Sequence, residues 1–476
     1  MAGSWSRAAA TSRSGSKRRA TPRRRPSRPE AMRETAAVEA HYRDEIPVRQ
    51  GDPFAVRRAE AVGEFFRAGG FPTATLEDWR FSDLDALGRT AYRRYSDVPT
   101  LVPPKTDELP EWVDDFGCRV LLSEGHPLNA EEFQNRNGLE VGNLPPVPAA
   151  DEQHDWGFVA AGAVPGGTEA DLDAPLRHPL EILNAGLFGC GFRVRVGRSQ
   201  DAGPILLYSL RHDVGHPAML HPRSVIELAP GSRLTVVEAH DGASETAGWT
   251  NPSTLCRLGE NAELRYVRVE LESGNIAHTG RVTFQLARNA RVHSTVLSLT
   301  GGKSRTDTAA ILSEEGAEVD LEGLFLGVNA AKADQHTLAI HAARHTTSRQ
   351  LFKNVLSDEA TAVFDGKVVV APGAIGTDAS QANRNLLLSQ KAAVHTRPRL
   401  EINADDVKCA HGAAIGRLDE DALFYLRSRG LGRMDSHEIL VRGFAGEVVE
   451  KVPVAAVRGL ARDGLTRVRE SRSFAA

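Results

Sequence analysis

Residues 281–299 read Arg281-Val-Thr-Phe-Gln-Leu286, Ala-Arg-Asn-Ala290 and Arg291-Val-His-Ser-Thr-Val-Leu-Ser-Leu299. Apolar and polar residues alternate on both sides of the polar break, which predicts a strand, a tight corner and a second strand. The same frame recurs along the chain: a leucine, a small residue four positions later and an aliphatic residue six positions later. The frames are Leu228/Ser232/Leu234, Leu258/Ala262/Leu264, Leu286/Ala290/Val292 and Leu388/Ala392/Val394, with longer versions at Leu312/Gly316/Val319 and Leu356/Ala360/Val363.

This repeat predicts a stacked β architecture between about residues 175 and 416. The steps from one leucine to the next are 30, 28, 26, 44 and 32 residues. Two short strands cannot bury an apolar face alone, so each unit must stack on its neighbours as a β-solenoid. A β-sandwich is the alternative, because its strands also alternate. The recurrent small residue at one corner favours the solenoid, since sandwich loops need not repeat.

The whole chain has 476 residues, and composition divides the part outside the β region into three segments. Residues 1–34 are expected to be a disordered basic tail, because residues 1–29 carry eight Arg, one Lys and no acid. Residues 35–150 are expected to form an N-terminal helical or mixed domain, with a helix running from the Asp52-Pro53 cap to Gly69-Gly70 and Trp79 packed on it. Residues 417–476 are expected to form a C-terminal helical domain.

Charge and cysteine content exclude several classes of protein. The formal net charge of -4 predicts no overall attraction to nucleic acid, and no apolar run is long enough to span a membrane. Cys118, Cys190, Cys256 and Cys409 lie far apart, without a disulfide framework or a Cys-x-x-Cys motif, which favours a reducing cytosolic compartment. The basic tail leaves three alternatives open: a solvated extension or over-long start, a transit peptide, or a nucleic-acid contact.

The chemistry of the chain is concentrated at Cys409-Ala-His411, near the end of the β region. The strand ending at Ile402 and the strand containing Cys409 have opposite parity, so Asp405-Asp406 predicts a corner or bulge between them. Side chains two residues apart on a strand lie about 6 to 7 Å apart, which is loose for one zinc ion but suits a larger site. The alternative is a buried cysteine and a hydrogen-bonded core histidine.

Other polar clusters are weaker candidates. Asp405 and Asp406 resemble the paired carboxylates of a β-helical carbohydrate-active enzyme, but consecutive strand residues point to opposite faces. Asn383 and Asn385 share one face and predict a structural polar ladder. His336, His341 and His345 are interpreted as solvated loop or face residues and not as a metal site.

Helical patterning resumes after Gly416. A short helix is predicted after Asp419, because acidic residues occupy its first turn, Arg427 lies in its last turn and Gly430 follows its end. Asp435 with Glu438 predicts a capping box at the start of the next helix. These helices are expected to cap the exposed end of the solenoid. Their apolar stripe is predicted to dock a partner, and its residues are Ile439, Leu440, Phe444 and Val448.

Several longer motifs resemble one known family. They are Phe352-Lys-Asn-Val-Leu356, Val363-Phe-Asp-Gly-Lys367, the segment 377–389, Pro398-Arg-Leu-Glu-Ile402, the segment 404–413 and Leu423-Phe-Tyr-Leu-Arg-Ser-Arg-Gly430, with Glu77-Asp-Trp-Arg-Phe-Ser-Asp-Leu84 near the N-terminus. Together they resemble the SufB/SufD family of iron–sulfur cluster assembly scaffolds, and within it the SufD branch. The resemblance implies a mainly β protein: a right-handed parallel β-helix between helical terminal domains.

The resemblance also implies a function. The chain would be a non-enzymatic scaffold subunit that pairs with a SufB-like subunit and a SufC-like ATPase, in the cytoplasm, to build a nascent iron–sulfur cluster. His411, and less directly Cys409, would lie at the interface and contribute metal ligands shared with the partner, while the chain alone holds no cofactor. The principal cysteine of the sister subunit falls near Asn383, and Gly412 stands where SufB-like chains have Glu.

Three functions therefore remain in competition at this point. They are the scaffold subunit, a β-helical carbohydrate-active enzyme, and a metal-free solenoid interaction protein. A homodimer in isolation is also left open. The stripe on the C-terminal helices would dock the ATPase in the first case.

Overall fold

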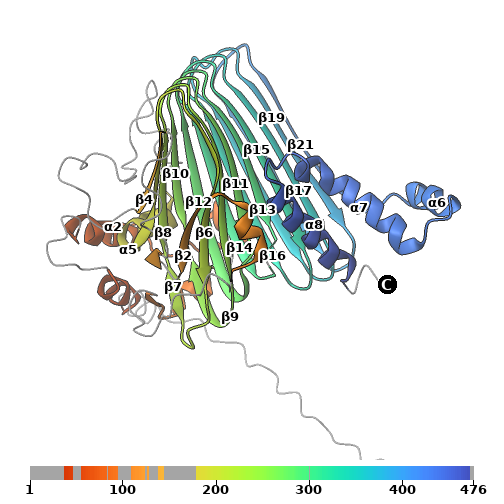
Figure 1. The fold of residues 1–476 in the computed structure, drawn as a ribbon, viewed down its shortest axis with the longest axis horizontal. Helices are drawn as coiled ribbons and strands as arrows, with labels where there is room; N and C mark the ends of the chain where they lie inside the picture. Colours follow the sequence, from red (N-terminus) through yellow and green to blue (C-terminus); the bar gives the residue numbers. More distant parts are fainter. Residues whose placement is uncertain are drawn as a thin grey trace, which may run out of the picture.

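A parallel β-solenoid forms the centre of the molecule, and the chain alternates between its two sheets (Figure 1). The computed structural model describes residues 37–46, 55–82, 84–94, 109–123, 126–127, 138–143, 178–299 and 301–471. Sheet A contains β5 (Cys190–Val196), β8 (Pro222–Leu228), β10 (Ser253–Leu258), β12 (Ser273–Leu286), β14 (Lys303–Leu312), β16 (Lys332–His341), β18 (Thr361–Val370) and β20 (Ala393–Ile402). Sheet B contains β2 (Cys118–Ser123), β6 (Asp201–Arg211), β9 (Arg233–Thr250), β11 (Glu263–Glu270), β13 (Arg291–Ser298), β15 (Glu318–Gly327), β17 (Thr347–Leu356), β19 (Asp378–Leu387) and β21 (Lys408–Gly416).

Identical positions of successive turns lie directly beside one another. In sheet A the register pairs Leu228 with Leu258, Leu258 with Leu286 and Leu286 with Leu312. Each leucine therefore packs on the leucine of the next turn, so the apolar face left by one unit is buried by its neighbour. The expected solenoid is confirmed, and the sandwich is excluded because the neighbouring strands are parallel and in register.

Two of the predicted frames belong to the other corner of the solenoid. The frames at Leu228, Leu258, Leu286 and Leu312 end strands of sheet A, whereas Leu356 ends β17 of sheet B. Leu388 follows β19, and its backbone N–H donates to the Leu356 carbonyl at 2.8 Å. The 44-residue step from Leu312 to Leu356 therefore spans one and a half turns, because it starts at the end of a sheet A strand and finishes at the end of a sheet B strand. Both corners use the same small-residue frame, so the sequence repeat alone does not distinguish them.

The corners that lead from sheet A to sheet B turn on residues with left-handed backbone conformations. Asn261, Asn289 and Asp406 have φ angles of 57°, 53° and 52°. The Asn261 N–H donates to the Arg288 carbonyl at 2.9 Å, so one corner is hydrogen-bonded to the next. Asn, Asp and Gly tolerate this conformation better than other residues, which explains the polar break in each unit.

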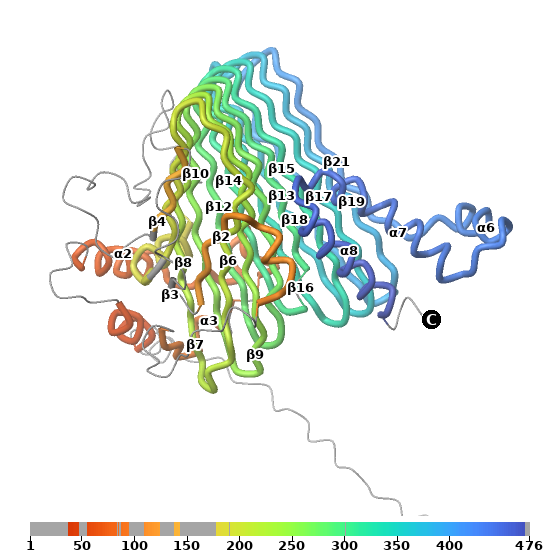
Figure 2. Tube along the Cα trace, viewed as in Figure 1, coloured from red at the N-terminus to blue at the C-terminus, as the bar shows by residue number. Residues whose placement is uncertain are grey.

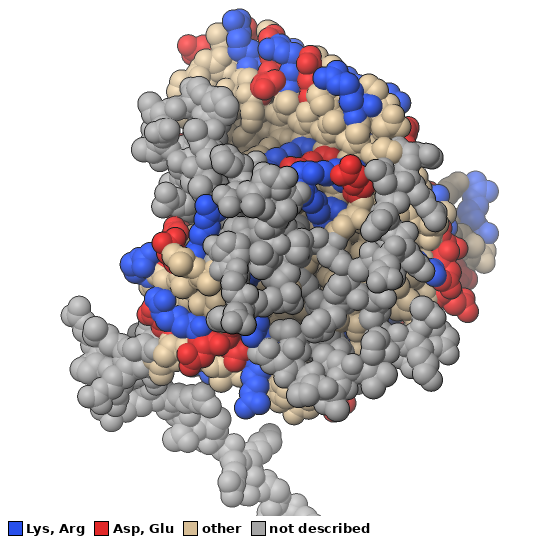
Figure 3. Space-filling model, turned by 60° about the vertical axis from the view of Figure 1, so that its left-hand side comes forward, with Lys and Arg blue, Asp and Glu red and all other residues tan. Residues whose placement is uncertain are grey.

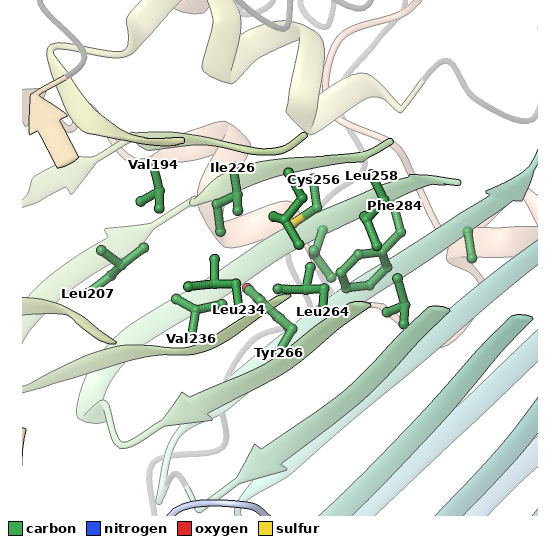
Figure 4. Close-up of a cluster of buried hydrophobic side chains, with 14 of the residues drawn as sticks. Val194, Leu207, Ile226, Leu234, Val236, Cys256, Leu258, Leu264, Tyr266 and Phe284 are labelled. Carbon is green, nitrogen blue, oxygen red and sulfur yellow. The ribbon is translucent and has the colours of Figure 1, made fainter. Parts of the chain in front are cut away.

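The space between the sheets is filled by apolar side chains (Figure 4). Val194, Ile226, Cys256 and Phe284 come from sheet A and face Leu207, Val236, Leu264 and Tyr266 of sheet B. Leu286 and Phe284 are essentially inaccessible to solvent. The interior of these turns is therefore closed.

Helices of the N-terminal region lie beside the first turns of the solenoid (Figure 2), and residues 77–82 reach later strands of sheet A. A helix over residues 37–44 and α2 (Ala55–Arg67) pack with α5 (Pro179–Leu187), where a Cβ on Gly186 would lie 2.5 Å from Val62 Cγ2. Gly69 and Gly70, with positive φ, follow α2 as expected, whereas Asp52-Pro53 and the tail 1–34 lie outside the described residues. The other elements are η1 (Glu77–Trp79), α3 (Asp85–Arg89), β1 (Arg93–Arg94), η4 (Glu111–Asp115), β3 (His126–Pro127), β4 (Leu139–Asn143) and β7 (Ala218–Leu220).

Some strands of the N-terminal segment extend the sheets of the solenoid. β2 pairs in parallel with β6, and β4 pairs antiparallel with β5. The first turns are therefore completed by β2 and β4, which precede the sequence repeat in the chain.

The C-terminal helices lie along sheet B and leave the end of the solenoid open. α6 (Glu420–Ser428) projects away from the sheets, while α7 (Arg433–Val449) and α8 (Ala455–Arg469) pack against β15 and β17 (Figure 1). The expectation that these helices cap the end is wrong, because their apolar residues Val441, Val448 and Leu465 share one cluster with the outer face of sheet B. The predicted capping box is also wrong: α7 begins after Gly432, without a side-chain cap.

Candidate functional site at the last turn

The last turn of the solenoid is formed by β20, β21 and the corner between them. Within the described residues, β20 pairs only with β18 and β21 only with β19, so each has one free edge. A free edge carries unpaired backbone N–H and C=O groups, and it can accept another strand. Most side chains of β21 are exposed, including Ile415.

Cys409 lies on the interior side of β21 and is half-buried. It is paired in register with Ala379 of β19 and packs on the apolar cluster that contains Leu400 and Val407. Partial burial raises the pKa of the Cys409 thiol above its ordinary value, and the Asp378 carboxylate raises it further, against an opposing backbone hydrogen bond from Ala379. The thiol is therefore protonated at neutral pH in the isolated chain.

His411 occupies the next position on the same face of β21 and is exposed. Its register partner on β19 is the buried Gln381, whose Nε2 donates to Gln350 Oε1 at 3.1 Å. The side chain of Gln381 beneath His411 is thus enclosed, while His411 itself is available to solvent. The structure brings Cys409 and His411 to one strand face, and neither is the fully buried core residue of the alternative interpretation.

Asn383 and Asn385 form the predicted polar ladder. Asn354 Nδ2 donates to Asn385 Oδ1 at 2.7 Å, and Asn385 Nδ2 donates to Asn383 Oδ1 at 2.7 Å and to the Ala414 carbonyl at 3.0 Å. Both amides are buried. Their role is structural: they fasten β21 to the preceding turns.

Asp405 and Asp406 lie in the exposed corner between β20 and β21. The Asp406 carbonyl accepts the Gly376 N–H at 2.9 Å, which continues the stack of corner bonds. The expected corner is confirmed, and its backbone geometry accounts for the two acidic residues. This accounts for them without a carbohydrate-cleaving acid pair.

One of the three histidines interpreted as solvated is buried. His341 lies inside the solenoid, where Thr346 Oγ1 and Ser348 Oγ are each 2.8 Å from a ring nitrogen. Burial lowers the pKa of His341 to about 4. The prediction for His341 is wrong: the alternation of β16 places residue 341 inside and His336 outside, and the two hydroxyl groups allow a histidine to be buried there. His345 is an exposed corner residue with φ of 55°.

The N-terminal motif 77–82 crosses sheet A and is attached to several of its strands. We call this segment the strap. The Trp79 ring lies 3.6 Å from the Arg305 guanidinium of β14, and Phe81 stacks on His395 of β20 with ring centroids 4.2 Å apart. Trp79 also shares an apolar cluster with Phe65 of α2, as expected.

An ion network joins the strap to β20. The buried Asp365 of β18 accepts Arg397 Nε at 2.9 Å and Arg399 Nη2 at 2.7 Å. Arg397 also contacts Glu77, and both arginines reach Asp78, at 3.1 and 3.0 Å. Sequence reasoning missed this network. The alternation of Arg397 and Arg399 placed both arginines on the outer face of one strand, but it did not identify their partners at residues 77 and 78.

The four residues of the predicted docking stripe have different environments. Val448 is buried against sheet B, and Phe444 is partly buried beneath the Lys353 ammonium, which lies 4.6 Å from its ring centroid. Leu440 is partly exposed and Ile439 is exposed. The largest exposed aromatic residues nearby are Phe424 and Tyr425 of α6.

The described surface has no single dominant charge on the face that Figure 3 presents, where basic and acidic side chains are intermixed. Among the described residues, no group of three or more His, Cys, Asp or Glu side chains is arranged to hold a metal ion. No helix of the described part is long and apolar enough to cross a membrane.

These features define a solenoid protein with a free terminal turn and helical appendages. Residues 211–444 match the family model described as the SufBD core domain of SUF system FeS cluster assembly. The chain is 33% identical over 424 residues to an iron–sulfur cluster assembly SufBD family protein of Synechocystis, covering 86% of this chain and 90% of that one. It therefore belongs to the SufBD family of iron–sulfur cluster assembly proteins.

Two further relatives agree with this assignment. The iron–sulfur cluster assembly protein SufD of Escherichia coli is 29% identical over 385 residues, covering 80% of this chain and 85% of the relative. The chloroplastic protein ABCI7 of Arabidopsis thaliana is 35% identical over 247 residues, which is 51% of this chain and 52% of the relative.

Proposed function

We propose that this chain is a SufD-like, non-catalytic scaffold subunit that pairs with a SufB-like subunit through its last turn. The observation that carries the proposal is the pair of free edges on β20 and β21, with Cys409 and His411 on β21. Backbone groups at a free edge gain hydrogen bonds when a partner strand is added. The nascent iron–sulfur cluster is cargo assembled at this junction, and the setting is the cytoplasm.

In this proposal His411 and Cys409 contribute ligands from one side and the partner supplies the principal thiolate. A protonated, half-buried Cys409 is a poor ligand in the isolated chain, because the thiolate is the form that binds metal. Pairing with a cationic iron centre would favour the thiolate. The chain alone therefore holds no cluster, and two copies joined at the same edges are the competing assembly.

The test compares His411→Ala and Cys409→Ser with the control His293→Ala, which removes an exposed histidine from β13, far from the last turn. Isolated variants are melted, then reconstituted anaerobically with the partner subunits, iron and a sulfur source. His411→Ala is expected to keep the free energy of unfolding within about 0.5 kcal/mol of the wild-type value and to reduce the visible absorbance of the assembled cluster. Cys409→Ser has a smaller effect and the control none. Normal absorbance in His411→Ala would contradict the proposed site.

We place the contact with a SufC-like ATPase on α6 and the adjoining start of α7. The exposed side chains Phe424, Tyr425 and Ile439 supply the accessible apolar surface, whereas Val448 holds α7 on sheet B. Removing all three helices would uncover sheet B, so point variants give a cleaner test. The double variant Phe424→Ser/Ile439→Ser should lose ATPase pull-down, and Val56→Ser, on the exposed side of α2, should retain it. Retention by the double variant would place the ATPase elsewhere.

A further inference from the structure

A solvent-connected cavity of about 330 Å³ lies between the N-terminal region and the solenoid, away from the last turn. One side is formed by residues 82–92, including α3, and the other by β12, β14, β16 and Ala247 of β9. Figure 2 shows α3 at the lower end of the solenoid, near β7 and β9. The volume lies within the range that small-molecule sites occupy.

The walls of this cavity are mainly apolar. Leu84, Leu87 and Tyr92 come from the N-terminal side, and Ile276 and Ala277 come from β12. These side chains approach from two separate parts of the chain and are held by the packing of α3 against the solenoid. A flat or ring-shaped apolar group would therefore be enclosed from both sides.

The charged groups at the cavity are predominantly basic. Lys303, Arg305 and Lys332 line it together with the carboxylate of Asp334. The Arg305 guanidinium is already engaged, because Nε and Nη2 donate to Asp307 at 2.8 and 2.9 Å. Lys332 Nζ donates to the Phe81 carbonyl, which leaves it further donor hydrogens.

Lys303 differs from the other two basic residues. Its side chain is exposed at the cavity, and among the described residues no group is hydrogen-bonded or ion-paired to its ammonium. A second polar group is also incompletely satisfied. His278 lines the cavity and is buried, and its Nε2 has no hydrogen-bond partner among the described residues; Glu270 Oε1 lies 3.7 Å away. Buried polar atoms without partners are uncommon in native proteins.

We propose that this cavity binds a small organic anion with an apolar, ring-sized body. The carboxylate or sulfonate of the ligand pairs with Lys303, and its body lies between Leu87, Tyr92 and Ile276. This site is distinct from the last turn, and it does not depend on the assembly role proposed above. An anion is favoured over a cation because Lys303 and Lys332 outnumber the one carboxylate that lines the cavity.

The test uses two fluorescent probes with the same aromatic body. One is 8-anilinonaphthalene-1-sulfonate and the other is the uncharged N-phenyl-1-naphthylamine. Fluorescence titration of the full chain should show one saturable site that binds the sulfonate more tightly. Lys303→Gln should lower the affinity for the sulfonate by about three- to fivefold, which is the range of an exposed ion pair, and should leave the affinity for the neutral probe unchanged.

Two further variants make the result decisive. Ala277→Trp fills the cavity from β12 and should abolish binding of both probes, while Lys391→Gln removes an exposed lysine elsewhere and should change neither. The Lys303→Gln comparison remains valid if Ala277→Trp impairs folding, because Lys303 is exposed. Equal affinity for the two probes, or an unchanged sulfonate affinity in Lys303→Gln, would overturn the proposal.

Discussion

The middle turns and the last turn of the solenoid are built from the same unit but have opposite environments. At β12 and β13, strands lie on both sides and the interior is closed, so Leu286 is only 1% exposed. At β20 and β21 one side is free, and Ile415 is 53% exposed. In a solenoid, burial depends on the next turn, so the same alternating pattern gives a core in one place and an accessible surface in the other.

The largest expected difference between these regions is in core truncation. Leu286→Ala should lower the free energy of unfolding by about 2 to 5 kcal/mol, because it leaves a cavity between stacked leucines. The matched variant Ile415→Ala removes an exposed side chain and should cost less than about 0.5 kcal/mol. Equilibrium denaturation measures both. Equal losses would mean that the last turn is as tightly packed as the middle.

Buried and exposed histidines provide the next comparison. The pKa of His341 is lowered to about 4, so the folded chain excludes the proton that an unfolded histidine binds below about pH 6.5. Stability should therefore fall as the pH drops from 6.5 towards 4, by about 2 kcal/mol at pH 5 from this residue. His341→Gln should lose that part of the pH dependence, whereas His411→Gln should retain it. Denaturation at pH 7 and pH 5 tests the difference.

The sequence predicted the architecture of the middle turns better than it predicted their ends. Leu258, Leu286 and Leu312 identify stacked strands because the pattern of a solenoid is local and repeats. The position of α7 could not be predicted in the same way, since an apolar stripe such as that of Val448 shows that a helix is buried but not against which surface.

At the site, Cys409 and His411 were found from residue type and strand parity, and the Asp405-Asp406 corner from turn chemistry. The contacts of Arg397 with Glu77 and Asp78 join segments more than 300 residues apart. No local pattern encodes such a pair. His341 was interpreted as a solvated residue because a polar residue inside a closed turn is unusual for a core, whereas it is buried.

A smaller effect is expected where the strap meets the last turn. Asp365→Asn weakens the acceptor shared by Arg397 and Arg399, and should cost about 1 kcal/mol, because the arginines are partly exposed and water can replace the lost contacts. Hydrogen exchange in β20 should increase, while that of β12 should not change. Unchanged exchange in β20 would show that the strap does not stabilise the last turn.

The smallest effect is expected in thiol reactivity. Cys409 is half-buried, whereas Cys256 is fully buried in a middle turn, and burial raises the pKa of both thiols. Iodoacetamide should modify Cys409 slowly at pH 7.5 and faster as the pH rises, while Cys256 should resist modification until unfolding. Asp378→Asn should accelerate the modification of Cys409, because it removes a neighbouring negative charge that raises the pKa of the thiol. Peptide mass spectrometry follows both sites, and faster modification of Cys256 would reverse the comparison.

The described contacts of the strap with the last turn are made to β20, so the two strands of that turn are held to different extents. β20 is clamped from outside by Phe81 on His395 and by the arginine network, whereas β21 is attached chiefly through its ladder to β19 and the Asn385 contact with Ala414. In the proposed assembly, a partner strand would therefore meet one strand that is held from outside, β20, and one that is held by fewer described contacts, β21. Because Cys409 and His411 lie on the same strand, their separation is set by β21 itself, and a movement of β21 would carry both residues together towards the partner.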